Sequence, residues 1–231
     1  MRDLPRRSVT ALAYGGVVLA AVFAPPIVFR LVLAAAGVVA FAELVALRRA
    51  GRVVLVQGAI LLIGLLALWV LRGVTLPLSF IQNTIAIPHV LLIALFATWA
   101  ADVFSYLGGS LFGHHKIAPR ISPGKTWEGT LVGFVAAGVV FLVLNRAFGS
   151  WYPGAFGSTY PIDVVVAVGI GPVAFAGDLL ESLTKRHAGV KDSGTFLPGH
   201  GGMLDRIDSL VATAPFVLLP LLVPCCAPSL G

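Results

Sequence analysis

The sequence predicts an all-α integral membrane protein, a polytopic bundle of about seven to eight transmembrane helices with a polar site at its cytosolic face. Three observations predict this fold class. Of the 231 residues, 58% are hydrophobic and only 11% are charged, whereas a soluble domain carries about 25% charged residues. The mean hydropathy is +0.97. Several apolar runs also reach the ~20 residues that an α-helix needs to cross a bilayer.

Seven spans are expected from these runs, at residues 8–24, 27–47, 53–71, 89–109, 129–148, 162–181 and 208–225. The first run follows the basic start MRDLPRRS and meets Pro25-Pro26 without a small-residue cleavage pattern, which favours a retained helix over a signal peptide. The segment from Thr75 to Pro88 is apolar but short and contains Pro77. We expect it to be re-entrant or an eighth short span.

The polar segments divide the chain into two expected regions. Residues 1–88 hold N-terminal transmembrane helices, and residues 89–231 hold a catalytic transmembrane region with polar loops at 110–128 and 182–207. Loops of this length with so much polar content usually carry function.

Lysine and arginine predict the orientation of the spans. With the N-terminus inside, only Arg30, Arg72 and Arg146 fall outside, and thirteen of the sixteen basic residues fall on the inner side. Both polar loops are therefore expected on the cytosolic face of the cell membrane. The net charge of +6 is explained by this bias, so it does not indicate a nucleic-acid partner.

Four carboxylates are expected within the spans, where a charge costs about 2.5–3.5 kcal/mol. Glu43, Asp102 and Asp178 lie near cytosolic ends, and Asp163 lies near an outer end. Snorkelling towards the interface explains Asp163 and is an open alternative for Glu43. The short side chains of Asp102 and Asp178 snorkel poorly, so they indicate a partner or a wet cavity.

The stretch GDLLESLTKR places a polar stripe on the end of the sixth span. Asp178, Glu181, Ser182 and Lys185 stand at i, i+3, i+4 and i+7, which is one face of a helix. A polar stripe on the end of a membrane helix is expected to face a cavity rather than lipid.

Two further aspartates open the last span. Asp205 and Asp208 are again three residues apart. Together with Asp178 they are the predicted ligands of a hard divalent cation, for which Mg²⁺ is the candidate because it prefers oxygen ligands and keeps substrate phosphates in its shell. The alternative is that both are helix-start acids that favour the helix dipole.

The loop between these helices is basic and glycine-rich. Lys185, Arg186 and Lys191 are candidates to hold phosphate groups, although basic residues also mark the cytosolic side. The run PGHGG at residues 198–202 exposes backbone N–H groups that can approach an anion. His200 within it is a candidate ligand, proton donor or loop-fixing group, of which the last is the usual role of a lone histidine.

The first polar loop reads HHKIAPRISPGKTWEG, from His114 to Gly129. Its PGKT is not a phosphate-binding P-loop, because Pro119 stands where that motif needs glycine and no strand precedes it. Thr126 is expected to cap the fifth span, and Ser122 and Lys125 are candidates to face a phosphate. A basic loop with a helix cap is the alternative.

Two blocks of residues resemble the phosphatidate cytidylyltransferase family, also called CDP-diacylglycerol synthases. The first is Ser182-Leu-Thr-Lys-Arg, then Lys191-Asp192, then the unbroken run from Pro198 to Asp208. The second contains Asp102, Tyr106, Gly113 and the run from Lys116 to Gly129. The resemblance covers roughly residues 97–215, and the first three spans match only in being hydrophobic.

The resemblance implies a Mg²⁺-dependent transfer of CMP from CTP to phosphatidate, with CDP-diacylglycerol and pyrophosphate as products. Metal ligands would be Asp178, Asp205 and Asp208, with Asp102 and Glu181 as further candidates. The carried-over catalytic and substrate-binding residues are Lys185, Arg186, Lys191, Asp192, His200, Ser122, Lys125, Thr126, Ser182, Gly201, Gly202 and Arg206. The family is also associated with K⁺ and with homodimers, neither of which this sequence indicates.

The chain departs from the family pattern in the second block. Phe104 stands where glycine is usual, Ser110 where a basic residue is usual, and His114 where lysine is common. The packing around Asp102 and the charge of the first loop are therefore expected to differ. A related CTP-dependent enzyme acting on an isoprenoid or ether lipid is the nearest alternative. An ion transporter is disfavoured because the polar residues gather at one side.

Overall fold

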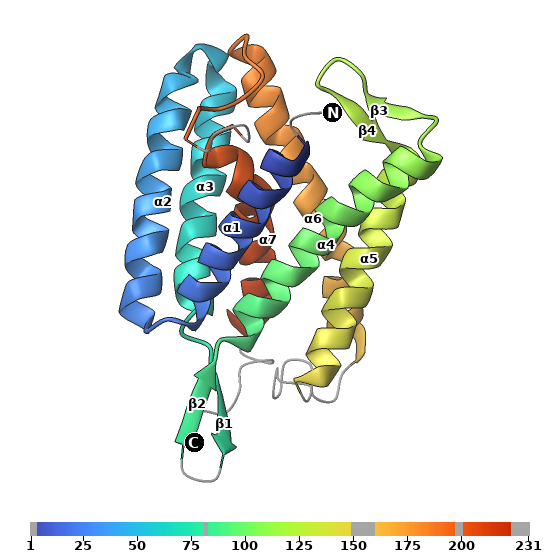
Figure 1. Cartoon of the computed structure of the whole chain (residues 1–231). Coiled ribbons are helices and arrows are strands. Elements are labelled where there is room, and N and C mark those ends of the chain that lie inside the picture. The colour runs from blue at the N-terminus through green and yellow to red at the C-terminus, as the bar shows by residue number, and fades with distance from the viewer. Residues whose placement is uncertain (1–3, 81–82, 149–159, 197–200, 223–231) are drawn as a thin grey trace.

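A computed structural model describes residues 4–80, 83–148, 160–196 and 201–222. Seven helices within these ranges form the bundle shown in Figure 1, each over one of the seven expected runs. They are α1 (Leu4–Phe23), α2 (Pro26–Ala46), α3 (Arg52–Leu71), α4 (His89–Phe112), α5 (Trp127–Ala147), α6 (Tyr160–His187) and α7 (Leu204–Leu222). A 3-10 turn, Arg48–Ala50, joins α2 to α3.

Five of the described helices are long and apolar enough to cross a membrane, namely α2, α3, α4, α5 and residues 162–187 of α6. The outer faces of the bundle expose large apolar side chains, such as Val38 at 70% and Leu55 at 74%. A surface of this kind is unsuited to water and suited to lipid. The prediction of an all-α polytopic membrane protein is therefore confirmed.

The segment from Thr75 to Pro88 adds no eighth helix to the described bundle. It forms an antiparallel pair of strands, β1 (Leu76–Phe80) and β2 (Asn83–Ile87), with Leu76 opposite Ile87 and Phe80 opposite Asn83. The hairpin extends beyond the ends of α3 and α4 (Figure 1). Pro77 disfavours a helix, and the β-branched residues of NTIAI favour a strand, so the expectation of a re-entrant segment or short span is corrected.

Close packing joins α4 to α5. A Cβ atom on Gly129 would lie 2.5 Å from the backbone nitrogen of Gly109 and from the carbonyl oxygen of Ser105, and one on Gly133 would lie 2.6 Å from the carbonyl oxygen of Ala101. Small residues let helix backbones touch in a membrane, where van der Waals packing drives association. These glycines fix α4 against α5.

Helix α7 lies centrally, against α3, α4 and α6. Its contact with α6 depends on Gly177, whose added Cβ would lie 2.6 Å from the Cβ of Ala212 and 2.8 Å from the carbonyl oxygen of Asp208. The residue after Gly177 is Asp178, so this close approach brings two aspartates from different helices near one another.

The two polar loops lie at the same end of the bundle as the start of α1 (Figure 1). The first folds into a short hairpin, β3 (Lys116–Ala118) and β4 (Ser122–Thr126). Thr126 then caps α5, since its Oγ1 accepts a hydrogen bond from the backbone nitrogen of Gly129 at 3.2 Å, as expected for the residue before a helix.

Candidate active site

A cavity of about 570 Å³ lies at the loop-bearing end of the bundle. Its walls come from α4, β4, α5, α6 and α7, and its polar lining is interrupted by Phe134 and Phe175. The cavity therefore collects side chains from both halves of the polar sequence, which are far apart along the chain.

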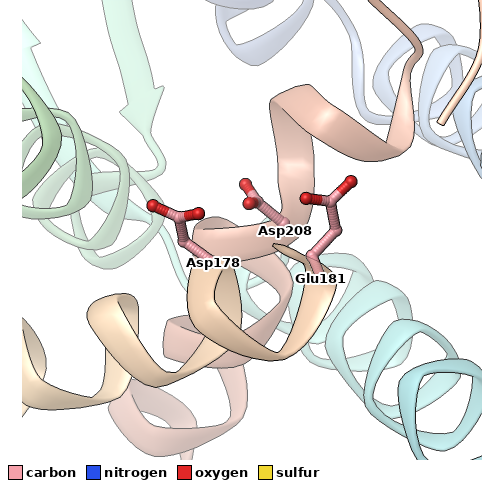
Figure 2. Close-up of side chains that lie close together, drawn as sticks. All are labelled: Asp178, Glu181 and Asp208. Carbon is pink, nitrogen blue, oxygen red and sulfur yellow. The ribbon is translucent and has the colours of Figure 1, made fainter. Parts of the chain in front are cut away.

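Three of the carboxylates that line this cavity lie close together, as Figure 2 shows. Asp178 and Glu181 lie one turn apart on α6, and Asp208 comes from the first turns of α7. One oxygen of each lies within 4.8 Å of the others. Glu181 is only 1% exposed and Asp208 only 9%. We call these residues the three-carboxylate cluster.

The three-carboxylate cluster is partly neutralised by two lysines. Lys125, from β4, pairs with Asp178, and its Nζ lies 4.6 Å from the centre of the Phe175 ring. The Nζ of Lys185 lies 2.5 Å from Glu181 Oε2 and 2.7 Å from Asp205 Oδ1. Each lysine is thus held beside a carboxylate, and both lysines line the cavity.

The donor set of the three-carboxylate cluster fits a divalent cation. Glu181 Oε1 is buried without a hydrogen-bond partner, which is costly unless an ion or a proton compensates it. Opposite oxygen ligands of Mg²⁺, at about 2.0–2.1 Å from the ion, stand about 4 Å apart. Neighbouring oxygen ligands of the same ion stand about 3 Å apart, so the three side chains, whose oxygens lie within 4.8 Å of one another, would have to close inwards around the ion.

Asp205 lies beside this cluster rather than within it. Its carboxylate accepts hydrogen bonds from the backbone nitrogens of Ser193, at 3.1 Å, and Gly202, at 2.8 Å, in addition to its bond with Lys185. Of the three aspartates predicted as ligands, the structure brings Asp178 and Asp208 together, and Glu181 supplies the third carboxylate.

Most of the other predicted residues also line the cavity. Asp102 faces it from α4 and accepts a hydrogen bond from Ser209 Oγ at 3.5 Å. The remaining predicted residues on the cavity wall are Ser122, Thr126, Asp192 and Arg206. The sequence thus identified both the acidic and the basic sides of this cavity.

Five predicted residues are not among those that line the cavity. Ser182 Oγ donates to Asp178 Oδ1 at 3.4 Å. Arg186 donates to the carbonyl oxygens of Ile121, at 3.0 Å, and Val190, at 3.2 Å, and so joins the two polar loops. Lys191 is exposed, while Gly201, at φ +84°, and Gly202 shape the turn before α7. His200 lies outside the described residues.

A stripe of small and polar residues on α4 was not assigned to the site from the sequence, although Tyr106 and Ser110 were named in the family resemblance. Ser105, Tyr106, Gly109 and Ser110 line the cavity beside Asp102. Their positions, three, four, seven and eight residues after Asp102, follow the helical repeat. That spacing was the available indication in an otherwise apolar helix.

The fold and the cavity define a polytopic helical membrane protein with a carboxylate- and lysine-lined site at one end. The chain belongs to the cytidylyltransferase family, whose family model matches residues 54–223. The resemblance seen in the sequence is therefore confirmed at the level of the family.

Several curated relatives carry the name phosphatidate cytidylyltransferase. That of Haemophilus influenzae is 42% identical over 126 residues, covering 54% of this chain and 43% of the relative. That of Thermotoga maritima is 45% identical over 130 residues (54% and 46%), and that of Brucella abortus is 40% identical over 145 residues (62% and 51%). The chain thus spans about half the length of the curated relatives it matches.

Proposed function

We propose that the chain transfers CMP from CTP to phosphatidate, giving CDP-diacylglycerol and pyrophosphate. The observation that carries this proposal is the three-carboxylate cluster with Lys125 and Lys185 in one cavity at the polar end of a membrane bundle. Family membership and the names of the relatives support the same activity. A membrane enzyme of this kind needs a site that both a water-soluble nucleotide and a lipid phosphate can reach.

Asp178, Glu181 and Asp208 would hold a Mg²⁺ ion, with Asp205 as a further candidate ligand. When bound, the ion supplies neutralisation of phosphate charge and of the departing pyrophosphate. The carboxylates of Glu181 and Asp208 are already buried, so they are oriented before any substrate arrives.

The chain's own part in the reaction is to bind and to orient. A lipid phosphate oxygen forms a bond to the α-phosphorus of CTP, and the bond from that phosphorus to the pyrophosphate oxygen breaks in line. Lys125 and Lys185 stabilise the phosphate oxygens, and the hydroxyls of Ser122 and Thr126, from the same strand as Lys125, hydrogen-bond the substrates. Positioning and electrostatics account for most of the catalysis of such transfers.

We further propose that this end of the bundle faces the cytosol of a cell whose plasma membrane holds the chain. The support is the sequence bias, in which thirteen of sixteen lysines and arginines fall on the loop-bearing side. Cytosolic CTP and Mg²⁺ would then reach the cavity directly.

The test is a transfer assay with purified protein in detergent, CTP, Mg²⁺ and phosphatidate, followed as lipid-linked CMP. We expect product with phosphatidate from the unaltered chain and none from Asp208→Asn. If product formed with an isoprenoid phosphate or an ether-lipid phosphate and none formed with phosphatidate, the proposal that phosphatidate is the acceptor would be wrong.

A further inference from the structure

Glu43 is a carboxylate on α2 that takes no part in lining the cavity. It precedes the region that the family model matches, which begins at residue 54. Snorkelling towards the membrane surface would explain a glutamate near the end of a span, and such a side chain needs no particular protein partner.

The carboxylate of Glu43 instead has three hydrogen-bond donors from distant parts of the chain. Oε1 accepts from the backbone nitrogen of Met203 at 3.0 Å. Oε2 accepts from the backbone nitrogen of Leu204 at 2.8 Å and from Ser193 Oγ at 3.1 Å. Glu43 therefore holds the residues where α7 begins, about 160 positions along the chain.

The backbone closes around this carboxylate without room for a further atom. A Cβ atom on Gly194 would lie 2.5 Å from Glu43 Oε1, and its three nearest atoms would all belong to the Glu43 side chain. A Cβ atom on Gly202 would meet Glu43 and Ser193 Oγ. Gly194 and Gly202 of this loop therefore both pack directly against the side chain of Glu43.

Asp205 completes the arrangement from the other side. It accepts hydrogen bonds from the backbone nitrogens of Ser193 and Gly202, the same segments that Glu43 holds through Ser193 Oγ and Met203. The two carboxylates therefore tie both described ends of the loop together at the start of α7. First-turn N–H groups of a helix lack partners within the helix, and a negative charge beside them is favourable.

This junction stands directly behind the cavity wall. Asp192 precedes Ser193, and Arg206 and Asp208 follow Leu204 within the first turns of α7, and all three line the cavity. Any rotation of the start of α7 would move Asp208 relative to Asp178 and Glu181, which come from α6.

We propose that Glu43 is a positioning residue for the reaction, acting through the start of α7 to hold the metal-binding carboxylates and Asp192 in their binding arrangement. The inference rests on the proposed function for its role in turnover. Its structural content, the attachment of the loop to α2, is measurable without any substrate.

Hydrogen exchange in the substrate-free protein tests the attachment. In Glu43→Gln, an amide replaces a carboxylate of nearly equal size and cannot accept all three bonds, so we expect faster exchange at residues 193–196 and 201–204 and unchanged exchange over α5. The matched control is Asp163→Asn, which makes the same chemical change at a buried carboxylate near the start of α6, and it should leave exchange at residues 193–196 and 201–204 as it is in the unaltered chain. Unchanged exchange in Glu43→Gln would overturn the proposal.

The affinity for CTP with Mn²⁺ tests the consequence for the cavity. Groups that orient metal ligands typically contribute about 10- to 100-fold to affinity or activity, so we expect a loss of this size in Glu43→Gln and none in Asp163→Asn, at equal thermal stability. Faster exchange without a loss of affinity would also overturn the proposal. If the unaltered protein binds CTP but transfers nothing to phosphatidate, the proposed function fails while this comparison still decides the role of Glu43.

A double variant makes the test specific to the contact. Gly194→Ala should impair nucleotide binding because the three atoms nearest to its methyl group all belong to Glu43. Glu43→Asp withdraws the carboxylate by one methylene, so Gly194→Ala should cost much less in that background than in the unaltered chain. Equal costs in the two backgrounds would contradict a direct contact between these residues.

Discussion

At the scale of single residues, charge balance governs the cavity. Six carboxylates and three basic side chains line it, a formal charge of −3, from Asp102, Asp178, Glu181, Asp192, Asp205 and Asp208 against Lys125, Lys185 and Arg206. Like charges within such a space repel strongly when water is scarce. A triphosphate that bound here, as proposed, would therefore have to bring, or to meet, a compensating cation.

Metal removal tests this balance. We expect CTP to bind in the presence of Mg²⁺ and to lose most of its affinity in excess EDTA, with affinity restored by added Mg²⁺. Calorimetry or equilibrium dialysis with radiolabelled CTP measures it. Equal CTP affinity with and without EDTA would contradict a role for the three-carboxylate cluster in metal binding.

The identity of the third ligand gives a sharper prediction. Glu181→Gln and Asp208→Asn should each weaken Mn²⁺ binding, measured by electron paramagnetic resonance, by about 100-fold or more, because even groups behind a ligand contribute 10- to 100-fold. Asp205→Asn should weaken it less, since its oxygens are occupied by backbone N–H groups and Lys185. Asp163→Asn is the control with no expected effect. A larger loss in Asp205→Asn than in Glu181→Gln would return Asp205 to the ligand set.

At the scale of elements, the separation of α6 and α7 decides whether the carboxylates meet. Gly177 has no space for a methyl group against Ala212 and the backbone of Asp208. Forcing extra atoms into such a contact costs about 1–3 kcal/mol, and the helices would have to move apart at the three-carboxylate cluster.

We therefore expect Gly177→Ala to lower both thermal stability and Mn²⁺ affinity. The matched control is Gly16→Ala on α1, where an added Cβ meets nothing within 4 Å, and it should change neither. Circular dichroism melting in detergent and the Mn²⁺ titration measure the two effects. A Gly177→Ala protein with undiminished metal affinity would show that α6 and α7 tolerate a wider separation.

The helices themselves were predictable, because a run of about 20 apolar residues is a direct property of the chain. The hairpin of β1 and β2 was not, since Thr75 to Pro88 is apolar without being long and hydropathy does not distinguish strand from helix. Lys125, Asp178 and Asp208 were identified from spacing and charge. Glu181 was correctly placed on the polar stripe. That Glu181, and not Asp205, joins Asp178 and Asp208 in the three-carboxylate cluster depends on how α6 and α7 pack at Gly177.

Contacts between segments that are far apart along the chain could not be predicted from the sequence. Glu43 meets Met203 and Leu204 across about 160 residues, and no local pattern encodes such a pairing. A glutamate near the end of a span is expected both if it snorkels towards the interface and if it makes a specific protein contact, so the sequence at Glu43 does not separate the two explanations. Only the positions of Gly194 and Gly202 around the carboxylate distinguish them.

At the scale of the whole molecule, the polar loops gather at one end of the bundle and the hairpin of β1 and β2 extends from the other (Figure 1). If the loop-bearing end is cytosolic, a cysteine at Thr195 should resist an impermeant maleimide in intact cells and react in inverted vesicles. A cysteine at Thr75 should do the reverse. Both positions are exposed.

The labelling is best done in a Cys225→Ser, Cys226→Ser background, since these are the two cysteines of the sequence. Reaction of the Thr195 cysteine from outside intact cells would invert the proposed orientation. It would also require CTP to come from the outer compartment, which would conflict with the proposed function.

The pairing of Lys125 with Asp178 has a thermodynamic consequence. A cation that engages Asp178 competes with the ammonium of Lys125, and a phosphate that engages Lys125 competes with Asp178. Each ligand therefore removes an obstacle to the other, and linkage requires the two enhancements to be equal. The ion pair between Lys125 of β4 and Asp178 of α6 would then make metal and nucleotide bind cooperatively. Each would raise the affinity of the cavity for the other by the same factor.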